Sequence, residues 1–497
     1  MLVAATVVAA VGGLILRFWS PSPLWLDEAL SVNIASLPFA DMAEALRHDG
    51  HPILYYLLLG WWIDLFGDSN FAVRSMSGIF SAATVPVLWL IGKRFDPRTT
   101  RIALILALSG PFLIRYGTEA RMYSLVVLLV ALGWLAVLRA IDSPTASGLL
   151  LVGVVAAALV HTHYWTFWLI AATLLSLGWV AVRSPQTASP HRRIAAAIVV
   201  GSSTLVVWLG VLYDQATSTG TPWAGRGRPA EVLVETIQAI GGSHRYEGES
   251  LGILLVLAAL VGMFALAPDS DQIVLTRPSH SISAGAAMVA VLTLAIGGAV
   301  ALALASAFEP RYAAVVIPFV TLLAARGIAM SPRGLAAAVV SIVVITGLAV
   351  GTDEARRDRT QAGDVAAAID DSAGAGDVVI FCPDQVGPST LRELDQQISL
   401  DQQLTTVAYP TGTGRFVDWT DYLERIASVD PVEFAEQIDQ RAGSSKIWMV
   451  TGQGYRGFGA RCDAIIDTLA AVRPSSAVTS PSLAFEAMAL RRFEARP

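Results

Sequence analysis

The sequence predicts a polytopic α-helical membrane protein with a soluble α/β domain at its C-terminal end. Hydrophobic residues make up 54% of the 497 residues and charged residues only 15%, whereas an average soluble domain carries about 25% charged residues. A water-facing surface of this length needs more charge, but a lipid-facing surface does not. Long apolar stretches recur as far as Gly351, and short β-like runs follow that residue.

About eleven stretches have the length and apolar character of membrane-spanning helices. They lie near residues 2–18, 71–92, 102–114, 123–139, 148–162, 165–182, 194–213, 251–267, 284–307, 312–329 and 334–351. We interpret the first stretch as a retained helix rather than a signal peptide, because it lacks a basic segment and a small-residue cleavage site. The shorter stretch 51–66 contains an aromatic pair near its end and predicts an interfacial helix, with a twelfth span as the alternative.

Three loops rich in Lys and Arg predict the orientation of the chain. Residues 93–101, 183–193 and 326–333 carry these basic side chains. With an interfacial 51–66 helix they fall on one side, which the positive-inside rule predicts to be cytoplasmic. Most unusual polar residues then lie on the outer side, in particular in the first outer loop 20–50. This asymmetry predicts an outward-facing active site.

The composition changes after Gly351, so we divide the chain into a membrane domain, 1–351, and an α/β domain, 352–497. The runs DVVIFC, TTVAY and KIWMV predict strands, and RCDAIIDTLAAV predicts an amphipathic helix. Cys382 and Cys462 are the only cysteines, which excludes a cysteine-rich scaffold and leaves a disulfide between them open. The absence of a basic tract excludes nucleic acid as an expected partner.

Two adjacent acids, Asp27 and Glu28, follow the first span in a setting rich in Trp and Leu. A carboxylate beside apolar surface can act as a general base. The alternative, which spacing alone favours, is that Asp27 caps the helix that begins at EALSVNIA.

Several further outer-loop residues are candidates for chemistry, each with a structural alternative. His48, Asp49 and His51 could bind a metal or simply precede a helix that starts with Pro52. Charged residues at a membrane boundary are functional candidates or loop-anchoring ion pairs, and here they are Arg115, Glu119 and Arg121. His163 lies among aromatic residues that are typical of an interfacial belt.

The segment FEPRYAAVVIP places Arg311 and Tyr312 at another outer boundary. Guanidinium groups bind phosphate with two hydrogen bonds, so Arg311 suits a phosphate ligand. The alternative is an arginine that extends to the interface without a partner. Each motif is weak alone, but together they lie on one face.

The order of these motifs resembles the GT-C membrane glycosyltransferases. The branch it resembles most includes the protein O-mannosyltransferases, the aminoarabinose lipid A transferase and actinobacterial cell-wall glycosyltransferases. The motifs that carry the resemblance are the Asp-Glu pair, the His-Pro start of an apolar helix, NFAVRSMSGIF and RYGTEARMYSL. The resemblance covers roughly residues 1–350. It implies a GT-C fold and a polyprenyl-phosphate sugar donor.

The resemblance also implies roles for individual residues. Asp27 occupies the place of the first-loop catalytic acid, with Glu28 beside it, and Glu119 is the acid of the second outer-loop motif. His51 lies where the family approaches the lipid phosphate, although Ile53 replaces a second proline and some members have lysine instead of histidine. Further donor-binding residues or candidates are Arg121, Arg311, Tyr312, Arg115, Tyr123 and His163.

The chemistry agrees with this resemblance. A polyprenyl phosphate leaves only if its charge is stabilised, and an acceptor hydroxyl needs a base. We therefore expect a plasma-membrane enzyme that transfers a sugar, by single displacement with inversion, to an extracytoplasmic glycan, lipid or protein. Its need for a divalent cation is left open. The alternatives are a transporter or flippase, which would need polar groups at the bilayer midplane, and a binding-only receptor.

Overall fold

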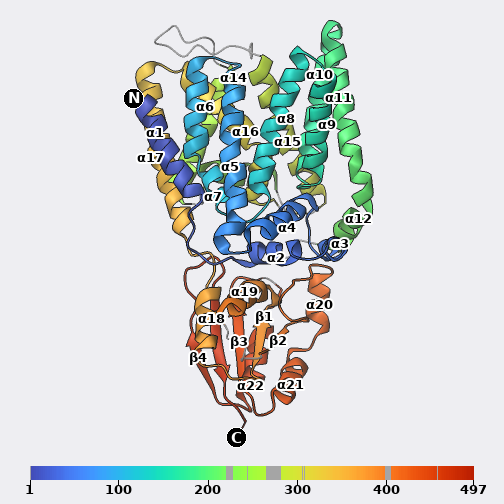
Figure 1. Cartoon of the computed structure of the whole chain (residues 1–497), viewed down its shortest axis with the longest axis vertical. Helices are drawn as coiled ribbons and strands as arrows, with labels where there is room; N and C mark the ends of the chain where they lie inside the picture. The colour runs from blue at the N-terminus through green and yellow to red at the C-terminus, as the bar shows by residue number, and fades with distance from the viewer. Residues whose placement is uncertain are drawn as a thin grey trace.

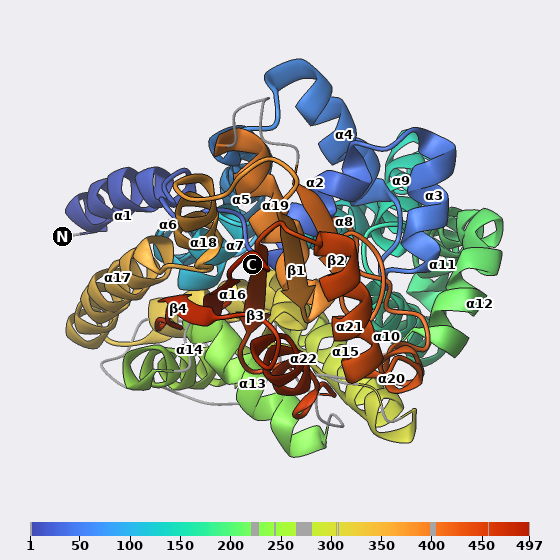
Figure 2. The same ribbon diagram turned by 90° about the horizontal axis from the view of Figure 1, so that it is seen from below.

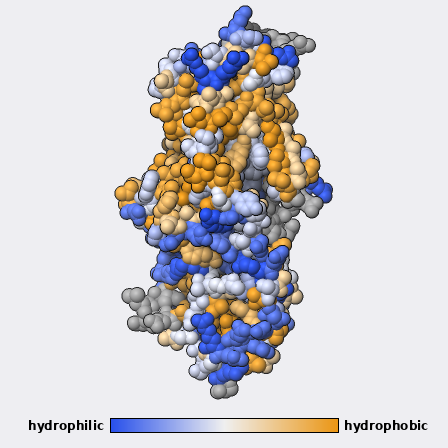
Figure 3. Space-filling model, turned by 90° about the vertical axis from the view of Figure 1, so that its right-hand side faces the viewer, coloured by the Kyte–Doolittle hydropathy of each residue, from blue (hydrophilic) through white to orange (hydrophobic). Residues whose placement is uncertain are grey.

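The computed structural model describes residues 2–219, 228–242, 245–264, 281–304, 306, 308–397, 404–455 and 457–496. A long helical bundle stands above a smaller domain that contains a sheet (Figure 1). Apolar side chains cover the middle of the bundle, whereas hydrophilic ones gather on the sheet domain and at the far end (Figure 3). This banded surface is the one expected of a chain that crosses a bilayer.

The bundle consists of helices that run between its two ends. They are α1 (Leu2–Arg17), α5 (Asn70–Gly92), α6 (Pro97–Ser109), α8 (Tyr123–Asp142), α9 (Ala146–Val160), α10 (Thr166–Arg183), α11 (Ala188–Ser202), α14 (Tyr246–Phe264), α15 (Ser281–Ala303), α16 (Ile317–Met330) and α17 (Arg333–Arg356). Among the described residues, seven helical segments are long and apolar enough to cross a membrane. The prediction of a polytopic helical membrane protein is confirmed. The ends predicted for two spans, at 265–267 and at 305 and 307, lie outside the described residues.

Shorter helices close the two ends of the bundle. The 31-residue apolar segment that begins with α11 continues through η2 (Ser203–Trp208) into α12 (Leu209–Ser218). The remaining short helices are α7 (Pro111–Gly117), η1 (Pro185–Thr187), α13 (Pro229–Gly241) and η3 (Pro310–Val315).

Two helices from the first outer loop, together with the helix of the predicted interfacial stretch 51–66, lie across the end of the bundle that faces the sheet domain (Figures 1 and 2). They are α2 (Leu26–Ala35), α3 (Phe39–Arg47) and α4 (Leu54–Phe66). The side chains of Trp61, Leu65 and Phe66 in α4 are 59–76% exposed. An apolar face left exposed in this position is what a helix at a membrane interface requires.

The sheet domain is a five-stranded α/β domain with strand order β2-β1-β3-β5-β4. Strand β1 (Val378–Cys382) pairs in parallel with β2 (Thr405–Ala408) and β3 (Ile447–Gly452). Strand β5 (Met488–Phe493) pairs antiparallel with β3 and with β4 (Ser475–Thr479). The three predicted strand-forming runs are β1, β2 and β3, so the predicted α/β domain is confirmed.

Helices cover this sheet on both faces. They are α18 (Ala362–Asp370), η4 (Asp384–Val386), α19 (Gly387–Gln397), α20 (Tyr422–Ser428), α21 (Pro431–Ala442) and α22 (Arg461–Ala470). A disulfide joins Cys382 at the end of β1 to Cys462 in α22, which answers the question that the sequence left open. Helix α17 continues five residues beyond the predicted boundary at Gly351, so only residues 357–361 link the last span to α18.

The basic loops gather at the end of the bundle that lies away from the sheet domain (Figure 1). Arg94 contacts Asp142 at 2.6 Å, and Arg98 donates a hydrogen bond to the carbonyl oxygen of Ser331 at 3.1 Å. These contacts connect the loop after α5 with the end of α8, and the first turn of α6 with the loop before α17. The first outer loop and the sheet domain lie at the opposite end.

We predict that Leu483→Cys and Ser143→Cys will react with a membrane-impermeant maleimide from opposite sides of the membrane. Leu483 is 99% exposed in the sheet domain, and Ser143 is exposed just after α8 at the other end. Because both native cysteines are joined in the disulfide, the unmodified chain serves as the unreactive control. Labelling of both variants from the same side of sealed vesicles would contradict this topology.

Candidate active site

An acid held between two arginines forms the centre of the candidate site. Asp27, in the first turn of α2, accepts a hydrogen bond from Arg311 Nη1 at 3.1 Å through its Oδ2 atom. The same oxygen lies 3.9 Å from Arg121 Nη2. Arg121 also donates to Ser31 Oγ at 2.8 Å. The site therefore joins α2, the segment before α8 and η3, which are far apart in the sequence.

The alternative interpretation of Asp27 as a helix cap is wrong. Helix α2 begins at Leu26, its N-cap residue is Trp25, and no side chain caps it. The carboxylate of Asp27 instead faces the guanidinium groups. The alternative for Arg311, an arginine that extends to the interface without a partner, is also wrong. Its guanidinium group contacts Asp27, and its side chain is only 19% exposed.

His51 orients Arg121 through a chain of hydrogen bonds. Its Nε2 atom lies 3.1 Å from Arg121 Nη2, and its Nδ1 atom lies 3.2 Å from Asp49 Oδ2. Since a guanidinium group only donates, Nε2 accepts and Nδ1 carries the proton that it donates to Asp49. Tyr56 completes the chain by donating to Asp49 at 2.7 Å. The hydrogen bonds thus select one neutral tautomer of His51.

The predicted metal alternative for His48, Asp49 and His51 is not supported. His48 Nδ1 points to the sheet domain, where it lies 3.0 Å from Asp418 Oδ1, whereas His51 points to Arg121. In the described ranges of the chain, no group of three or more His, Cys, Asp or Glu side chains is arranged to hold a metal ion.

Aromatic rings form one wall beside the two arginines. The ring of His163 lies 5.1 Å from that of Tyr312 and 5.7 Å from that of Tyr123. Burial, together with neighbouring cationic groups, holds the pKa of His163 well below its usual value, so the ring is neutral near pH 7. His163 Nδ1 accepts a hydrogen bond from the backbone N–H of Trp165.

Three buried polar atoms around this centre have no hydrogen-bond partner among the described residues. They are Arg121 Nε, Arg311 Nε and the hydroxyl of Tyr123. Buried donors without partners are uncommon in folded proteins and commonly indicate a site for a ligand or an ordered water molecule. Two of these atoms belong to guanidinium groups, which are cationic, so the arrangement favours an anion as the ligand.

Glu28, although adjacent to Asp27, faces a different set of partners. Arg74 Nε donates to its Oε1 atom at 2.8 Å and Arg74 Nη2 to its Oε2 atom at 2.6 Å. The backbone N–H of Ala120 donates at 2.8 Å, and Arg359 Nη1 lies 3.7 Å away. Successive helical residues point about 100° apart, which separates the two carboxylates. Glu28 is completely buried and its oxygens are occupied by these partners.

Sequence analysis did not identify Arg74 and Arg359 as members of this network. Arg359 donates to the carbonyl oxygen of Thr118 at 2.6 Å and to its hydroxyl at 2.7 Å. Arg74 was visible as a charge near the start of an apolar span, which is a signal for a buried ion pair. Arg359 lies in a segment rich in charged residues, so nothing local distinguishes it.

Glu119 and Arg115 form the ion pair that the sequence offered as their structural alternative. Arg115 Nη2 lies 3.2 Å from Glu119 Oε2, and Arg115 Nη1 lies 2.8 Å from Glu354 Oε2 in α17. Glu119 is 1% exposed. The pair thus ties the loop after α7 to the end of the last span.

A cleft of about 190 Å³ opens beside this centre, between the bundle and the sheet domain. It is lined by Trp25, Phe112, Arg115, Tyr116, Glu119, Gln238, Ala239, Gly242, Glu309, Pro310, Arg311, Glu354, Arg357 and Phe485. Phe485 comes from the sheet domain, and its ring packs edge-on against Trp25 at 5.0 Å. Both parts of the chain therefore build the cleft.

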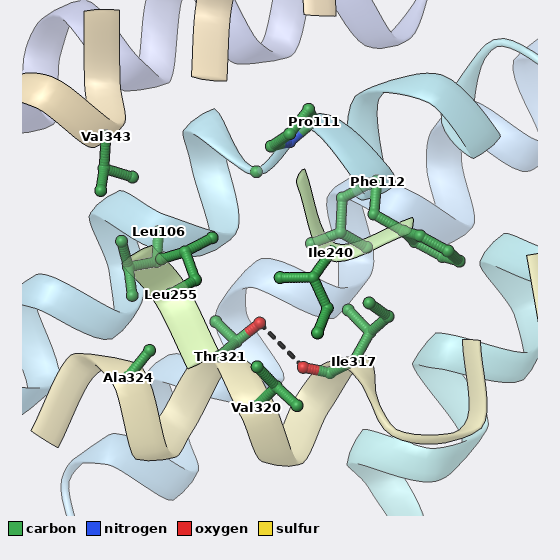
Figure 4. Close-up of a pocket in the computed structure, with 12 residues that line it drawn as sticks. Leu106, Pro111, Phe112, Ile240, Leu255, Ile317, Val320, Thr321, Ala324 and Val343 are labelled. Carbon is green, nitrogen blue, oxygen red and sulfur yellow. Dashed lines mark hydrogen bonds between the residues drawn. The ribbon is translucent and has the colours of Figure 1, made fainter. Parts of the chain in front are cut away.

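A small apolar cavity of about 30 Å³ lies inside the bundle near this cleft (Figure 4). Phe112 lines both spaces. Leu106, Ile240, Leu255 and Val343 point into the cavity from four different helices.

The fold and the site define a class of protein: a polytopic membrane protein with an acid–arginine centre at the outer-loop end of its bundle. The structure is similar to ArnT from Cupriavidus metallidurans, with a TM-score of 0.60 over 98% of this chain and 97% of that chain, at 13% identity. The same protein bound to undecaprenyl phosphate also gives a TM-score of 0.60, at 12% identity with the same coverage.

Another similar structure is the mycobacterial arabinofuranosyltransferase AftD, with a TM-score of 0.53 at 14% identity. The match covers 99% of this chain but 40% of AftD. ArnT and AftD are GT-C glycosyltransferases. The chain therefore has the GT-C fold, and the predicted resemblance is confirmed.

A more particular match is to the family described as dolichyl-phosphate-mannose-protein mannosyltransferase, whose model matches residues 50–208. This range includes His51, Glu119, Arg121 and His163, but neither Asp27 nor Arg311. A comparison with curated proteins gives no match.

We predict that Arg359→Ala will lower the melting temperature of the full chain. Removing one member of a buried ion pair costs about 3–5 kcal/mol, because the remaining charge stays buried. Thermal unfolding in detergent measures this effect. Arg415→Ala is the matched control, because its pair with Asp395 is about half exposed and contributes about 0–1 kcal/mol. Equal melting temperatures for the two variants would refute the importance of the buried network.

Proposed function

We propose that this protein is a GT-C glycosyltransferase that transfers a sugar from a polyprenyl-phosphate donor to an acceptor hydroxyl outside the cytoplasm. The observation that carries the proposal is the carboxylate of Asp27 between Arg311 and Arg121, at the end of an apolar bundle. An acid and two guanidinium groups are the protein groups that this reaction needs. The similarity to ArnT, whose structure has been solved with undecaprenyl phosphate, supports the donor class.

In the proposed reaction, Asp27 is the general base. Its carboxylate takes the proton of the acceptor hydroxyl as the acceptor oxygen bonds to the anomeric carbon of the sugar. The bond between that carbon and the phosphate oxygen breaks, and polyprenyl phosphate leaves with the electron pair. Since no protein nucleophile takes part, this single displacement inverts the anomeric configuration.

Arg311 and Arg121 stabilise the phosphate as its charge increases. Each has a buried Nε atom without a partner in the described part of the chain, in addition to the Nη atoms that contact Asp27. Guanidinium groups suit phosphate because they can donate two parallel hydrogen bonds. His51 holds Arg121 in place, and the rings of His163 and Tyr312 limit access of water.

We further propose that Glu28 and Glu119, which were predicted to be catalytic, act as positioning residues. Glu28 is bound by Arg74, and Glu119 is bound by Arg115. Glu28 and Glu119 are 0% and 1% exposed, whereas the side chain of Asp27 is 19% exposed, so Asp27 is the acid that a hydroxyl entering from the cleft can reach. Both hold the loop that carries Arg121.

The proposed location is the plasma membrane, with the active site and the sheet domain outside the cytoplasm. The disulfide in the sheet domain supports this, because disulfides persist in oxidising compartments. The basic loops at the other end of the bundle support it independently, because Lys and Arg accumulate in cytoplasmic loops.

The arrangement of the charges weighs against a transporter or flippase. Such proteins place ionisable groups and broken helices near the bilayer midplane. Here the acid–arginine centre lies next to α2 and the sheet domain, at one end of the bundle.

We predict that Asp27→Asn will reduce kcat by about 10²–10⁴-fold, the loss that follows removal of a general base. Donor binding should remain, because Arg311 and Arg121 are unchanged. Transfer from a radiolabelled polyprenyl-phosphate sugar in membranes provides the measurement. Asp41→Asn, in the exposed part of α3, serves as the control and should keep normal turnover. Near-normal turnover in Asp27→Asn would exclude Asp27 as the base.

We predict that Arg311→Ala will weaken the binding of polyprenyl phosphate by about tenfold or more, because a charged hydrogen bond contributes about 1.5–3 kcal/mol. Arg311→Lys should recover only part of this loss, since an ammonium group cannot donate two parallel bonds. Inhibition of transfer by added polyprenyl phosphate reports the affinity. Arg245→Ala, at an arginine whose side chain is 71% exposed, is the control. An unchanged inhibition constant in Arg311→Ala would remove Arg311 from the donor site.

A further inference from the structure

We propose that the cleft between the bundle and the sheet domain binds the acceptor, and that this acceptor is a neutral carbohydrate that packs against Phe485 and Trp25. The inference rests on the proposed function and specifies the substrate class of the same site. The sheet domain thereby helps to select the acceptor instead of only stabilising the bundle.

The charges of the cleft favour a neutral ligand. Its lining contains three arginines and three glutamates. Arg115 is paired with Glu119 and Glu354, and Arg357 lies 3.7 Å from Glu354. The third arginine, Arg311, is occupied by Asp27 and, in our proposal, by the donor phosphate. Each arginine that lines the cleft thus has an anionic partner already, so none is left to bind a phosphate or carboxylate group of an acceptor.

One carboxylate in the cleft remains available for hydroxyl groups. Glu309 precedes η3, and its side chain forms no ion pair or hydrogen bond with any other residue that the structure describes. Carboxylate oxygens accept hydrogen bonds from hydroxyls. A sugar presents several hydroxyls around its ring, so it can satisfy Glu309 without introducing a charge.

The aromatic residues of the cleft supply the complementary apolar surface. Phe485 lines the cleft, and 56% of this large apolar residue is exposed. Trp25 is 6% exposed, and its buried indole N–H has no hydrogen-bond partner among the described residues. Aromatic rings gain stability by covering apolar surface, and the C–H face of a sugar ring provides such a surface.

The position of this aromatic pair also suits delivery of a hydroxyl to the base. Trp25 occupies the N-cap position of α2, two residues before Asp27. Arg311 lines the cleft and donates to Asp27 at 3.1 Å. A sugar that packs against Trp25 and Phe485 would therefore lie beside the proposed base, on the side where the sheet domain closes the cleft.

The first test measures acceptor binding without a donor. The full chain in nanodiscs is titrated with neutral tetrasaccharides of mannose, arabinose, galactose and glucose, and with a peptide rich in Ser and Thr. We expect at least one tetrasaccharide to bind, and Phe485→Ala to weaken that binding by about five- to tenfold. Phe485→Tyr should preserve the binding, because it keeps the ring.

Leu483→Ala is the matched control, because Leu483 lies in the same loop and is 99% exposed. Glu309→Gln should also weaken the binding of the tetrasaccharide, since an amide accepts hydrogen bonds less strongly than a carboxylate. Binding that is unchanged in Phe485→Ala, the absence of tetrasaccharide binding to the wild type, or binding of the peptide alone would overturn the proposal.

The second test separates this inference from the proposed function. With a polyprenyl-phosphate sugar as donor, Phe485→Ala should raise the KM for the bound tetrasaccharide while kcat at saturation stays close to wild type. Asp27→Asn should still bind the tetrasaccharide but transfer sugar to it about 10²–10⁴-fold more slowly than the wild type. Binding that depends on Phe485 in a chain that transfers no sugar from any such donor would refute the proposed function and leave the carbohydrate site in place. A lower kcat with an unchanged KM would contradict the acceptor site.

Discussion

The buried ion network around Glu28 is the interaction on which the rest of the site depends. Arg74 binds both of its oxygens, and Arg359 lies 3.7 Å away while it binds Thr118. These side chains connect α2, α5, the loop before α8 and the segment that enters the sheet domain. Charges buried in this manner are stable only when their partners are in place, so the network forms only in the correct assembly of all four segments.

The orientation of Asp27 follows from this network. Because Glu28 is fixed on one side of α2, the preceding residue is directed toward Arg121 and Arg311. His51 then holds the guanidinium group of Arg121 from the other side. A base and its neighbouring cations act efficiently only when they are held in a fixed geometry. For the proposed base Asp27, buried polar contacts provide that rigidity.

The sheet domain is part of the site as well as a neighbour of it. The side chain of Asn33 in α2 donates to the carbonyl oxygen of Arg415, and the backbone N–H of Trp419 donates to the carbonyl oxygen of His48. Phe485 completes the cleft from below. In our proposal, this arrangement gives the enzyme a water-exposed surface for the acceptor, while the donor lipid stays in the bilayer beside the bundle.

The sequence by itself determined the class of the protein, the positions of the long apolar helices and three of the five strands of the sheet domain. Hydrophobic length and periodicity are local properties, so they can be read along the chain. The order of the motifs also indicated Asp27, Arg121 and Arg311 as candidate site residues. Only the tertiary structure decided that Asp27 faces two arginines while Glu28 faces Arg74, and that Phe485 lines the cleft. These outcomes depend on contacts between segments distant in the sequence, and side-chain direction at such contacts is set by packing that local patterns do not contain.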